Sequence, residues 1–299
     1  MVMDSSLKHI IIILHHGVLD SLSRLVSFFD NDFIVLIHVD RTVKLQKKAI
    51  RDFENVYSNA KIFQKYRIFW GGIGILKTEL FLLKYAISRF KFDYVHFLSG
   101  QDYLIKDINY FKLFFEQNNG KQFIEFNKLP YKNWEGGSLD RFMFFRLNDF
   151  INYRSKKGRY IIDMFNNIQR HYSINRRIPN HFSQLYGGSN WMSISEKCAI
   201  YIISHMKDHK SFFNRLRFTF GSDEVFFHTV VMNSEFKQSV VNDNLRYIDW
   251  NNPEYGPKIL GYEDWVILQE SKALIARKFH SIKSKILMDL LDIKTRIQN

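Results

Sequence analysis

The stretch HIIIILHHGVLDSLSRLVSFFDNDFIVLIHVD, residues 9–40, decides the fold that we expect. It holds two short apolar, β-branched runs, at residues 9–15 and 33–39, and each run is followed by polar residues. Between them, residues 21–29 repeat apolar side chains at helical spacing. The stretch therefore predicts a β-α-β unit with two parallel strands.

The same alternation continues along the first half of the chain. We expect a helix over 42–55, a short strand over 61–63, an amphipathic helix over 77–90 and a buried strand over 94–98. This order predicts an α/β fold with a mostly parallel central sheet flanked by helices. Ligands of such sheets bind beyond the carboxyl ends of the strands. Three polar clusters fall at strand ends, namely His15-His16-Gly17, His38-Val39-Asp40 and Ser99-Gly100-Gln101-Asp102.

The second half of the chain is less regular. Residues 120–185 mix basic and aromatic side chains, and we expect an extended loop region around a helix near 159–172. After Gly187-Gly188-Ser189 the pattern predicts a strand over 190–194, a helix over 195–206 and a further helix that begins at Asp223. From Glu263 onward we expect mainly helix, interrupted near 276–279.

Composition narrows the class of protein. The chain has 299 residues, of which 46% are hydrophobic, so it can bury a large core and is not a disordered protein. Its four prolines and 14 glycines form no linker-like run. The one cysteine, Cys198, excludes an internal disulfide, and its apolar helical surroundings predict a buried, inert thiol. We expect no membrane span and no secretion signal.

The formal net charge of +13 calls for an anionic partner, which could be a nucleic acid, a lipid surface or a phosphorylated substrate. The excess is local. Residues 141–177 hold nine Lys or Arg against two acids, and residues 272–299 hold seven against two. Aromatic residues interleave the first segment, as they would on a surface that binds nucleic acid. No named nucleic-acid fold is recognisable, so this class stays an alternative.

Several motifs of other classes are missing. There is no P-loop and no G-x-G-x-x-G turn, because Gly71-Gly72-Ile73-Gly74 lacks the spacing and the lysine. There is no G-x-S-x-G elbow of a serine hydrolase. No His, Cys, Asp or Glu set has the spacing of a zinc site. The triplet Asp30-Asn31-Asp32 precedes a strand instead of following one, which favours a turn. We therefore expect no metal site built by the protein.

The stretch FGSDEVFFHTVVMNS, residues 220–234, places two carboxylates at the start of an apolar helix. Ser222 can cap the helix, and Asp223 and Glu224 suit the positive end of its dipole. Taken alone, the pair predicts an ordinary acidic first turn.

Six stretches in order resemble one family, the core-2/I-branching N-acetylglucosaminyltransferases and peptide O-xylosyltransferases of glycosyltransferase family 14. They are HVD (38–40), WGGIGILKTELFLLKYAI through FDYVHFLSGQDYLIK (70–106), GGSNWMSIS (187–195), GSDEVFFHTVVMNS (221–234), LRYIDW (245–250) and ALIARKF (273–279). The order and the rough spacing match over most of the chain. Individually the motifs are weak, but together they are specific.

The resemblance implies a GT-A type fold over residues 1–299 as one domain. Residues 1–110 would form the nucleotide-binding half, and residues 111–299 would form the acceptor-binding half with a C-terminal phosphate-binding tail. It implies inverting transfer of a sugar, most plausibly N-acetylglucosamine, from a UDP-sugar to a hydroxyl of a glycan acceptor, without a cofactor or a metal ion. Where the metal-binding triplet of other GT-A enzymes would follow the strand, the chain has only Asp102.

The resemblance also implies roles for single residues. Without a metal, cationic side chains must stabilise the departing diphosphate. Arg277 and Lys278 are the implied pair, with Lys258 or Arg246 as a helper. Contacts with the nucleoside are implied at His15 and Asp40. Glu224 is the implied catalytic base, which takes the proton of the acceptor hydroxyl.

On the acceptor side, the resemblance implies positions at Asp102, Asn190, Trp191 and Asp223, the last of which also fixes the turn. Asn190 departs from xylosyltransferase-like members, which carry Asp there, so a sugar acceptor fits better than a peptide serine. Eukaryotic members are lumenal, membrane-anchored and rich in cysteine. We therefore expect a bacterial, cytoplasmic member that acts on lipopolysaccharide, capsule or other cell-surface polysaccharide, touches the anionic inner face of the cytoplasmic membrane and binds no nucleic acid.

Overall fold

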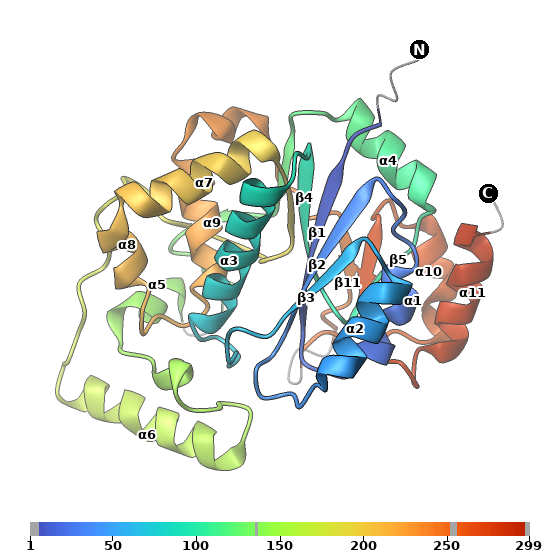
Figure 1. The fold of residues 1–299 in the computed structure, drawn as a ribbon. Coiled ribbons are helices and arrows are strands. Elements are labelled where there is room, and N and C mark those ends of the chain that lie inside the picture. Colours follow the sequence, from blue (N-terminus) through green and yellow to red (C-terminus); the bar gives the residue numbers. More distant parts are fainter. Residues whose placement is uncertain (1–5, 135–136, 252–255, 297–299) are drawn as a thin grey trace.

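The computed structural model describes residues 6–134, 137–251 and 256–296, and within them a seven-stranded sheet forms the centre of the fold (Figure 1). The strand order is β10-β6-β9-β4-β1-β2-β3, and every strand of it except β9 runs in the same direction. The strands are β1 (His9–His15), β2 (Phe33–Val39), β3 (Ala60–Phe63), β4 (Tyr94–Ser99), β6 (Gln122–Ile124), β9 (Met192–Ser195) and β10 (Val240–Val241). The predicted α/β fold with a mostly parallel sheet is confirmed.

The isoleucine run of β1 is explained by burial on both faces of the sheet. Successive side chains of a strand point to opposite faces. Ile11 and Ile13 accordingly join one hydrophobic cluster, and Ile10 and Ile12 join the other. A strand in the middle of a sheet that is covered on both sides needs apolar residues at every position, and alternation disappears.

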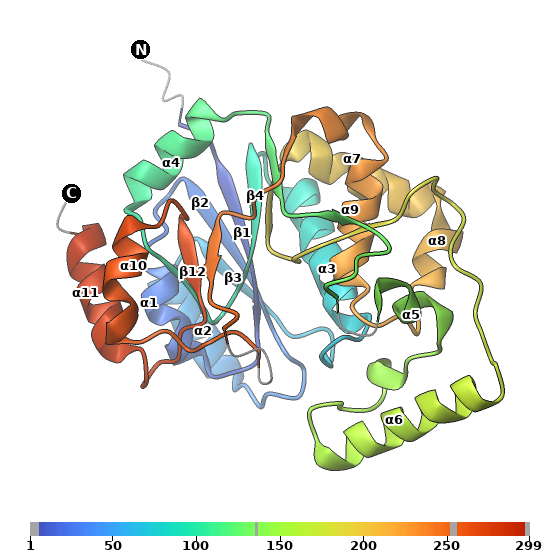
Figure 2. The same cartoon turned by 180° about the vertical axis from the view of Figure 1, so that it is seen from behind.

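Helices cover both faces, as Figures 1 and 2 show from opposite sides. The cluster around Ile10 and Ile12 takes in residues of α3 (Gly74–Arg89), α7 (Glu196–Asp208), α8 (Lys210–Arg215) and α9 (Asp223–Met232). The cluster around Ile11 and Ile13 takes in residues of α1 (Ser23–Val26), α2 (Lys47–Val56), α4 (Ile108–Gln117), α10 (Trp265–Glu270) and α11 (Lys285–Arg296). Within the described residues, no helix is both long and apolar enough to cross a bilayer.

Two smaller sheets complete the fold. The first joins β11 (Arg246–Ile248), β12 (Ile275–Arg277) and β5 (Asp102–Leu104), and the second pairs β7 (Asn127–Lys128) with β8 (Tyr186–Gly187). The interruption predicted in the helical tail near 276–279 is strand β12. Its register sets Arg277 opposite Asp102.

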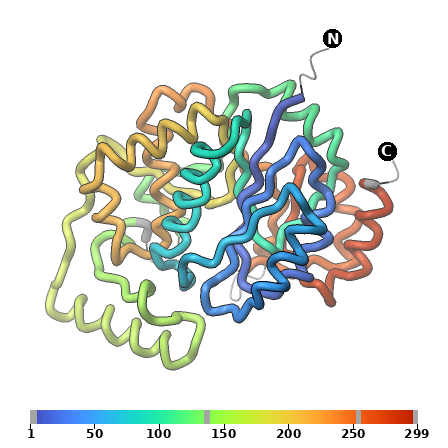
Figure 3. Tube along the Cα trace, in the orientation of Figure 1, coloured from blue at the N-terminus to red at the C-terminus, as the bar shows by residue number. Residues whose placement is uncertain are grey.

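The chain path brings the C-terminal helices back beside the first ones (Figure 3). Arg24 of α1 donates to Asp289 at 2.8 Å and to Asp292 at 2.5 Å, both on α11. Tyr103 of β5 also donates to Asp292, at 2.5 Å. These contacts anchor the tail, and with it β12, to the β-α-β unit at the start of the chain.

The segment predicted as an extended loop region is more ordered than expected. It holds β6, a short helix α5 (Gly137–Met143) and helix α6 (Lys156–His171). The predicted helix near 159–172 starts three residues earlier, because Ser155 caps it by accepting a hydrogen bond from the Gly158 amide at 3.0 Å. Two other predictions were wrong in extent: α2 begins at Lys47 instead of residue 42, and the helix expected over 21–29 is a 3₁₀ turn followed by the four residues of α1.

Cys198 lies buried in α7 with a free thiol, as predicted. Burial raises the pKa of this thiol, so it is not a thiolate at neutral pH.

A pair of buried histidines links β1 to β4 inside the core. His9 Nδ1 lies 3.0 Å from His96 Nε2, and His96 Nδ1 lies 2.9 Å from the hydroxyl of Ser193. The His9 ring stacks on Phe33 with centroids 4.8 Å apart. Burial, followed by the nearby charge of Lys112, lowers the pKa of His9 to about 4. The pair is therefore neutral in the folded protein at neutral pH.

We expect the free energy of unfolding to fall as the pH drops from about 6.5 to about 4, because His9 stays neutral in the folded chain while the unfolded chain binds the proton. The contribution of His9 to this loss is on the order of 3 kcal/mol. Urea denaturation between pH 4 and 7 measures it. His9→Phe should make the dependence shallower, since other buried histidines such as His15 still contribute, whereas His171→Phe, at an exposed histidine, should leave it unchanged. Equal slopes for all three proteins would contradict the assignment.

Candidate functional site

The carboxyl ends of β1, β2 and β4 meet at one edge of the sheet, because the three strands are parallel and adjacent. The polar residues that follow them are tied together by the backbone. The amide of Asp40 donates to the carbonyl of His15 at 2.8 Å, and the amide of Gly100 donates to the carbonyl of Leu14 at 3.0 Å. The edge predicted from the three polar clusters therefore exists as a continuous surface.

His15 is fixed in place at this edge. Its Nε2 lies 3.1 Å from the carbonyl oxygen of Val18 and 3.3 Å from the hydroxyl of Ser21. The ring packs against Gly100 so closely that a β-carbon on Gly100 would lie 2.0 Å from Nδ1. Burial lowers the pKa of His15 to about 4, so the ring is neutral at pH 7. The predicted contact with the nucleoside would have to be made by this neutral ring or by its backbone.

Asp40 is buried, and both of its carboxylate oxygens are bonded to the protein. Oδ1 accepts from the amide of Thr42 at 2.7 Å and from its hydroxyl at 2.5 Å, and Oδ2 accepts from the amide of Ile68 at 2.7 Å. The carboxylate therefore shapes the loops around it. Its predicted contact with a nucleoside stays a prediction.

Arg277 lies between two residues that were assigned to the acceptor. Its Nε is 3.2 Å from Oδ1 of Asp102, and its guanidinium lies 4.1 Å from the ring centroid of Trp191. Asp102 also accepts from the Ser99 amide at 2.7 Å. Burial raises the pKa of Asp102, and the Arg277 charge opposes that rise. Asp102 and Trp191 thus surround the cation predicted to hold the diphosphate.

Lys278 lies near two other cations, Arg154 and Arg277. Burial, and then the charges of Arg154 and Arg277, lower the pKa of Lys278. Burial, and then Arg154 and Lys278, lower the pKa of His16 as well. Like charges this close destabilise one another unless an anion joins them. Arg154, Arg277 and Lys278 therefore form a cation cluster beside the neutral ring of His16, and this cluster has the electrostatic character of an anion site.

Arg154 is a member that sequence reasoning missed. It was counted only as one of the basic residues of the 141–177 segment, because nothing in that run shows which side chain reaches the tail. In the structure it precedes the cap of α6, and its guanidinium lies 5.7 Å from the ring of Trp70.

The two predicted helper cations are engaged by the protein. Nζ of Lys258 lies 2.7 Å from Asp264 and 3.4 Å from Glu263. Arg246 is buried and donates to the carbonyl of Phe97 at 3.0 Å, to the hydroxyl of Ser193 at 3.3 Å and to the carbonyl of Asn244. A phosphate would have to compete with these acceptors, so a helper role for either residue stays a prediction.

Helix α9 begins with the two carboxylates, but Ser222 does not cap it. Its backbone is helical, with φ −62° and ψ −29°, and its side chain makes no capping hydrogen bond. A side-chain cap needs an extended backbone, so that the hydroxyl can reach the amides of the first turn. The expected cap was therefore wrong. Gly221, at φ +63°, turns the chain, and its carbonyl accepts from the amide of Glu224 at 3.1 Å.

Glu224 is held by Arg141 of α5. Nη1 of Arg141 donates to Oε2 of Glu224 at 2.5 Å, and the Arg141 guanidinium lies 4.0 Å from the ring of Trp134. The carboxylate keeps 35% side-chain exposure, so a ligand can reach it. A β-carbon on Gly221 would lie 2.6 Å from Arg141 Nη1 and 2.9 Å from Glu224 Oε2, which explains the glycine twice over. Arg141, like Arg154, was noted only as part of the basic segment.

Two further carboxylates lie beneath Glu224. Asp223 is 3% exposed, and burial, followed by the Glu224 charge, raises its pKa to about 7. Glu79 of α3 is 1% exposed, and burial, followed by the Asp223 charge, raises its pKa well above the usual value. The nearby side chain of Asn190 opposes this rise. Asp223 is thus buried where the accessible Glu224 is not, and its predicted place on the acceptor side stays a prediction.

Sequence reasoning missed Glu79, although a signal was present. On a helix, residue 79 shares one face with Leu76 and Leu83, so the acid stands on the apolar side. A carboxyl group there is buried, and burial raises its pKa, which favours the neutral form.

Residues 190 and 191 separate the two halves of the site. The side chain of Asn190 lies near Glu79, and the ring of the next residue, Trp191, lies 4.1 Å from the Arg277 guanidinium. Aromatic rings also connect the two halves. The ring centroid of Phe220 lies 5.3 Å from the Arg141 guanidinium and 5.1 Å from the ring centroid of Trp70. Glu224 and the cation cluster are thus linked through a series of contacts, from Arg141 through Phe220 and Trp70 to Arg154.

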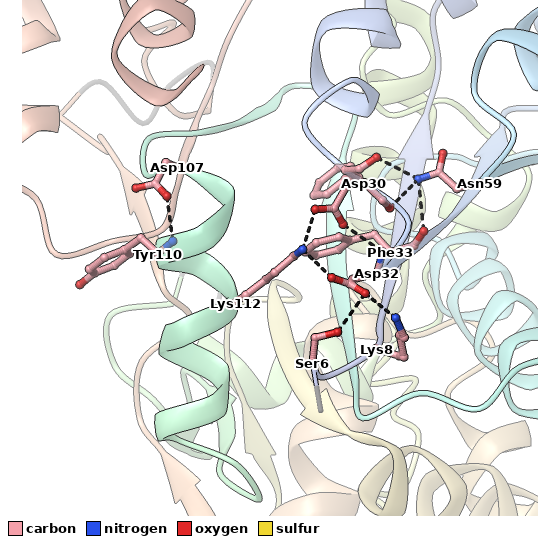
Figure 4. Close-up of polar contacts among 10 residues, drawn as sticks. Ser6, Lys8, Asp30, Asp32, Phe33, Asn59, Asp107, Tyr110 and Lys112 are labelled. Atoms are coloured by element: carbon pink, nitrogen blue, oxygen red, sulfur yellow. Dashed lines mark hydrogen bonds and ion pairs between the residues drawn. The ribbon is translucent and has the colours of Figure 1, made fainter. Parts of the chain in front are cut away.

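The triplet Asp30-Asn31-Asp32 lies elsewhere. Asp30 and Asp32 each accept from Nζ of Lys112 at 2.5 Å, and Lys8 also pairs with Asp32 (Figure 4). The segment precedes β2, at the amino end of the strand, and it forms the salt-bridged turn that the sequence indicated. Within residues 6–134, 137–251 and 256–296, no three His, Cys, Asp or Glu side chains lie close enough to hold a metal ion together.

Comparison with known proteins points to xylosyltransferases. The chain is 24% identical to Xylosyltransferase oxt of Drosophila melanogaster over 281 residues, which cover 86% of this chain and 30% of that protein. It is 24% identical to Xylosyltransferase 1 of Rattus norvegicus over 249 residues, 81% of this chain and 28% of that protein. It is 26% identical to Xylosyltransferase sqv-6 of Caenorhabditis elegans over 223 residues, 72% and 25%. The chain therefore spans less than a third of these curated relatives.

A family model matches well over half of this chain. The model described as Branch, the Core-2/I-Branching enzyme, matches residues 11–270. The matched range includes Glu224 and the strands of the central sheet from β2 to β10, while Arg277 and Lys278 of β12 and its end lie just beyond it. With its α/β architecture and its mostly parallel sheet, the chain belongs to the Core-2/I-branching enzyme family of glycosyltransferases.

Proposed function

We propose that this chain transfers a sugar from a UDP-sugar to a hydroxyl of a glycan acceptor, with inversion and without a metal ion. The observation that carries the proposal is the pairing of one accessible carboxylate, Glu224, with a cation cluster on the other side of residues 190 and 191. Transfer with inversion needs a base on the acceptor side, and positive charge where the diphosphate departs.

In this proposal Arg277 and Lys278 bind the diphosphate, with Arg154 and His16 beside them. Arg277 is held by Asp102 and stacked on Trp191, so its position is fixed before the nucleotide arrives. Such preorganised charge stabilises a developing anion without having to reorganise. Arg141 orients the Glu224 carboxylate toward the acceptor hydroxyl, and Asn190, near the buried Glu79, borders the acceptor.

The donor we propose is UDP-N-acetylglucosamine, and the acceptor a precursor of lipopolysaccharide, capsule or another cell-surface polysaccharide in the bacterial cytoplasm. A xylosyl donor is the second candidate, and the names of the relatives favour it. The uncharged Asn190 favours a sugar acceptor over a peptide in either case. The net charge of +13 supports peripheral contact with anionic lipid, where lipid-linked acceptors lie. A panel of UDP-sugars in the transfer assay distinguishes the donors.

Binding of UDP should raise the melting temperature by several degrees in EDTA, since a ligand at about 100 times its dissociation constant stabilises the folded state by about 2.7 kcal/mol.

Lys278→Ala should weaken UDP binding about ten- to a hundredfold, because it removes a charge-assisted contact. Lys272→Ala, on the same tail but exposed, is the matched control. A protein that ignores UDP but retains oligonucleotides in a salt-dependent manner would instead be a nucleic-acid binder.

Glu224→Gln should lower the rate of sugar transfer about 10²- to 10⁴-fold, because the amide cannot accept the proton of the acceptor hydroxyl. UDP binding, measured by calorimetry, should stay unchanged. Glu196→Gln is the matched control, since Glu196 also stands in the first turn of a helix. Full transfer activity of the Glu224 variant would assign the base to another residue.

Asp223→Asn should separate the role of Asp223 from that of Glu224. The raised pKa means that ionisation of Asp223 costs the wild type stability as the pH rises from about 4 to about 7, and the amide has no such cost. We therefore expect similar unfolding free energies at pH 4 and a variant that is more stable at pH 8, by on the order of 3 kcal/mol. Urea denaturation at the two pH values measures the difference. A stability difference between variant and wild type that is the same at pH 4 and pH 8 would show that Asp223 is ionised in the folded state as readily as in the unfolded one.

A further inference from the structure

Helix α6 stands at the outer side of the molecule, on the side to which the carboxyl ends of the parallel strands point (Figures 1 and 2). Its inner face is anchored mainly by polar contacts. Gln169 accepts from the amide of Phe145 at 2.8 Å and donates to the carbonyl of the same residue at 3.0 Å. Gly158, Ile162 and Asn166 complete the buried face. The face of α6 that packs on the rest of the chain is therefore fully occupied by these contacts.

The opposite side of α6 carries an apolar stripe that the described chain does not cover. Tyr160 is 70% exposed, Met164 46%, Ile168 43% and Tyr172 69%. The four residues are spaced by four, so they lie in one line about 18 Å long. Asp163, Asn167 and His171 line the same shallow groove. An amphipathic helix normally turns its apolar residues inward, so a second, outward stripe indicates a partner.

Basic residues flank this stripe at both ends. Residues 154–177 hold seven Lys or Arg and one acid, Asp163. Lys156 and Lys157 lie exposed in the first turn of α6. Cations there interact unfavourably with the helix dipole, so a favourable electrostatic partner for them must lie outside the helix. Arg159 follows them, and Arg170 stands near the other end. The combination of cations with Tyr, Met and Ile fits a partner that offers both anionic groups and an apolar layer.

We propose that α6 lies in the headgroup layer of an anionic membrane, with Tyr160, Met164, Ile168 and Tyr172 inserted and the flanking cations on lipid phosphates. The inference rests on the proposed peripheral membrane contact and assigns the surface that makes it. Tyrosines suit the two ends of the stripe, because a phenol ring prefers the boundary between water and hydrocarbon. A second copy of the chain would bring two basic helices together, and nucleic acid would leave Met164 and Ile168 without an apolar partner.

The placement also fits the proposed chemistry. Arg154, the last residue before the cap of α6, belongs to the cation cluster. A membrane below α6 would therefore face the edge at which the donor binds. A lipid-linked acceptor could reach Glu224 from that surface without leaving the bilayer.

The test is cosedimentation of the full chain with vesicles of phosphatidylcholine alone or with roughly a third phosphatidylglycerol. We expect binding to the anionic vesicles only, and weaker binding at high salt. Tyr160→Ser together with Met164→Ser and Ile168→Ser should lower the partition coefficient at least about tenfold. Lys156→Ala with Lys157→Ala should lower it about fivefold for each lysine.

Matched controls distinguish α6 from general basicity and stickiness. Val266→Ser with Ile286→Ser changes exposed apolar residues on α10 and α11, and Lys47→Ala with Lys48→Ala removes two exposed lysines at the start of α2. Both variants should bind vesicles like the wild type. Equal loss in the controls, no vesicle binding by the wild type, or a dimer that only the α6 variants dissociate in light scattering would each overturn the proposal.

The melting-temperature shift with UDP serves as an independent reading on every variant. An α6 variant that responds to UDP but does not bind vesicles supports the surface assignment. A wild type that binds vesicles through α6 but ignores UDP would leave the membrane surface intact and refute the transferase proposal.

Discussion

The buried contact between Arg277 and Asp102 is the constraint on which the rest of the site depends. It joins β12, near the end of the chain, to β5, which follows the central strand β4. Burying such a pair is costly unless further contacts compensate, and here the Ser99 amide and the face of Trp191 do so. Once Arg277 is fixed, Lys278 must lie at the carboxyl edge of the sheet. The contact therefore turns a basic tail into one side of a site.

The opposite side is organised by burial of acids instead of cations. Three carboxyl groups, from Glu79, Asp223 and Glu224, come together at the start of α9, and they cannot all be ionised in a desolvated site. Burial raises the pKa values of Glu79 and Asp223, whereas Glu224 keeps 35% side-chain exposure and pairs with Arg141. The division of labour among chemically similar groups follows from their depth below the surface.

The strands β1, β2 and β4 could be predicted from the sequence, because a central parallel strand needs an unbroken apolar run and leaves little ambiguity. The three-residue β6 and two-residue β10 could not, since such short runs carry no period. At the site, the family resemblance predicted Glu224, Arg277 and Lys278. Arg141 and Arg154 did not, because only tertiary contacts select them from a long basic segment. Ser222 was misjudged for a local reason, namely that capping depends on backbone angles that residue type does not reveal.

The close packing of His15 on Gly100 constrains how the sequence at these two positions can evolve. A β-carbon at position 100 would overlap the imidazole, so neither residue can be replaced freely while the other stays. Relatives that enlarge position 100 must shrink or move the ring at position 15. The two sites should therefore change in concert during evolution, although 84 intervening residues separate them along the chain.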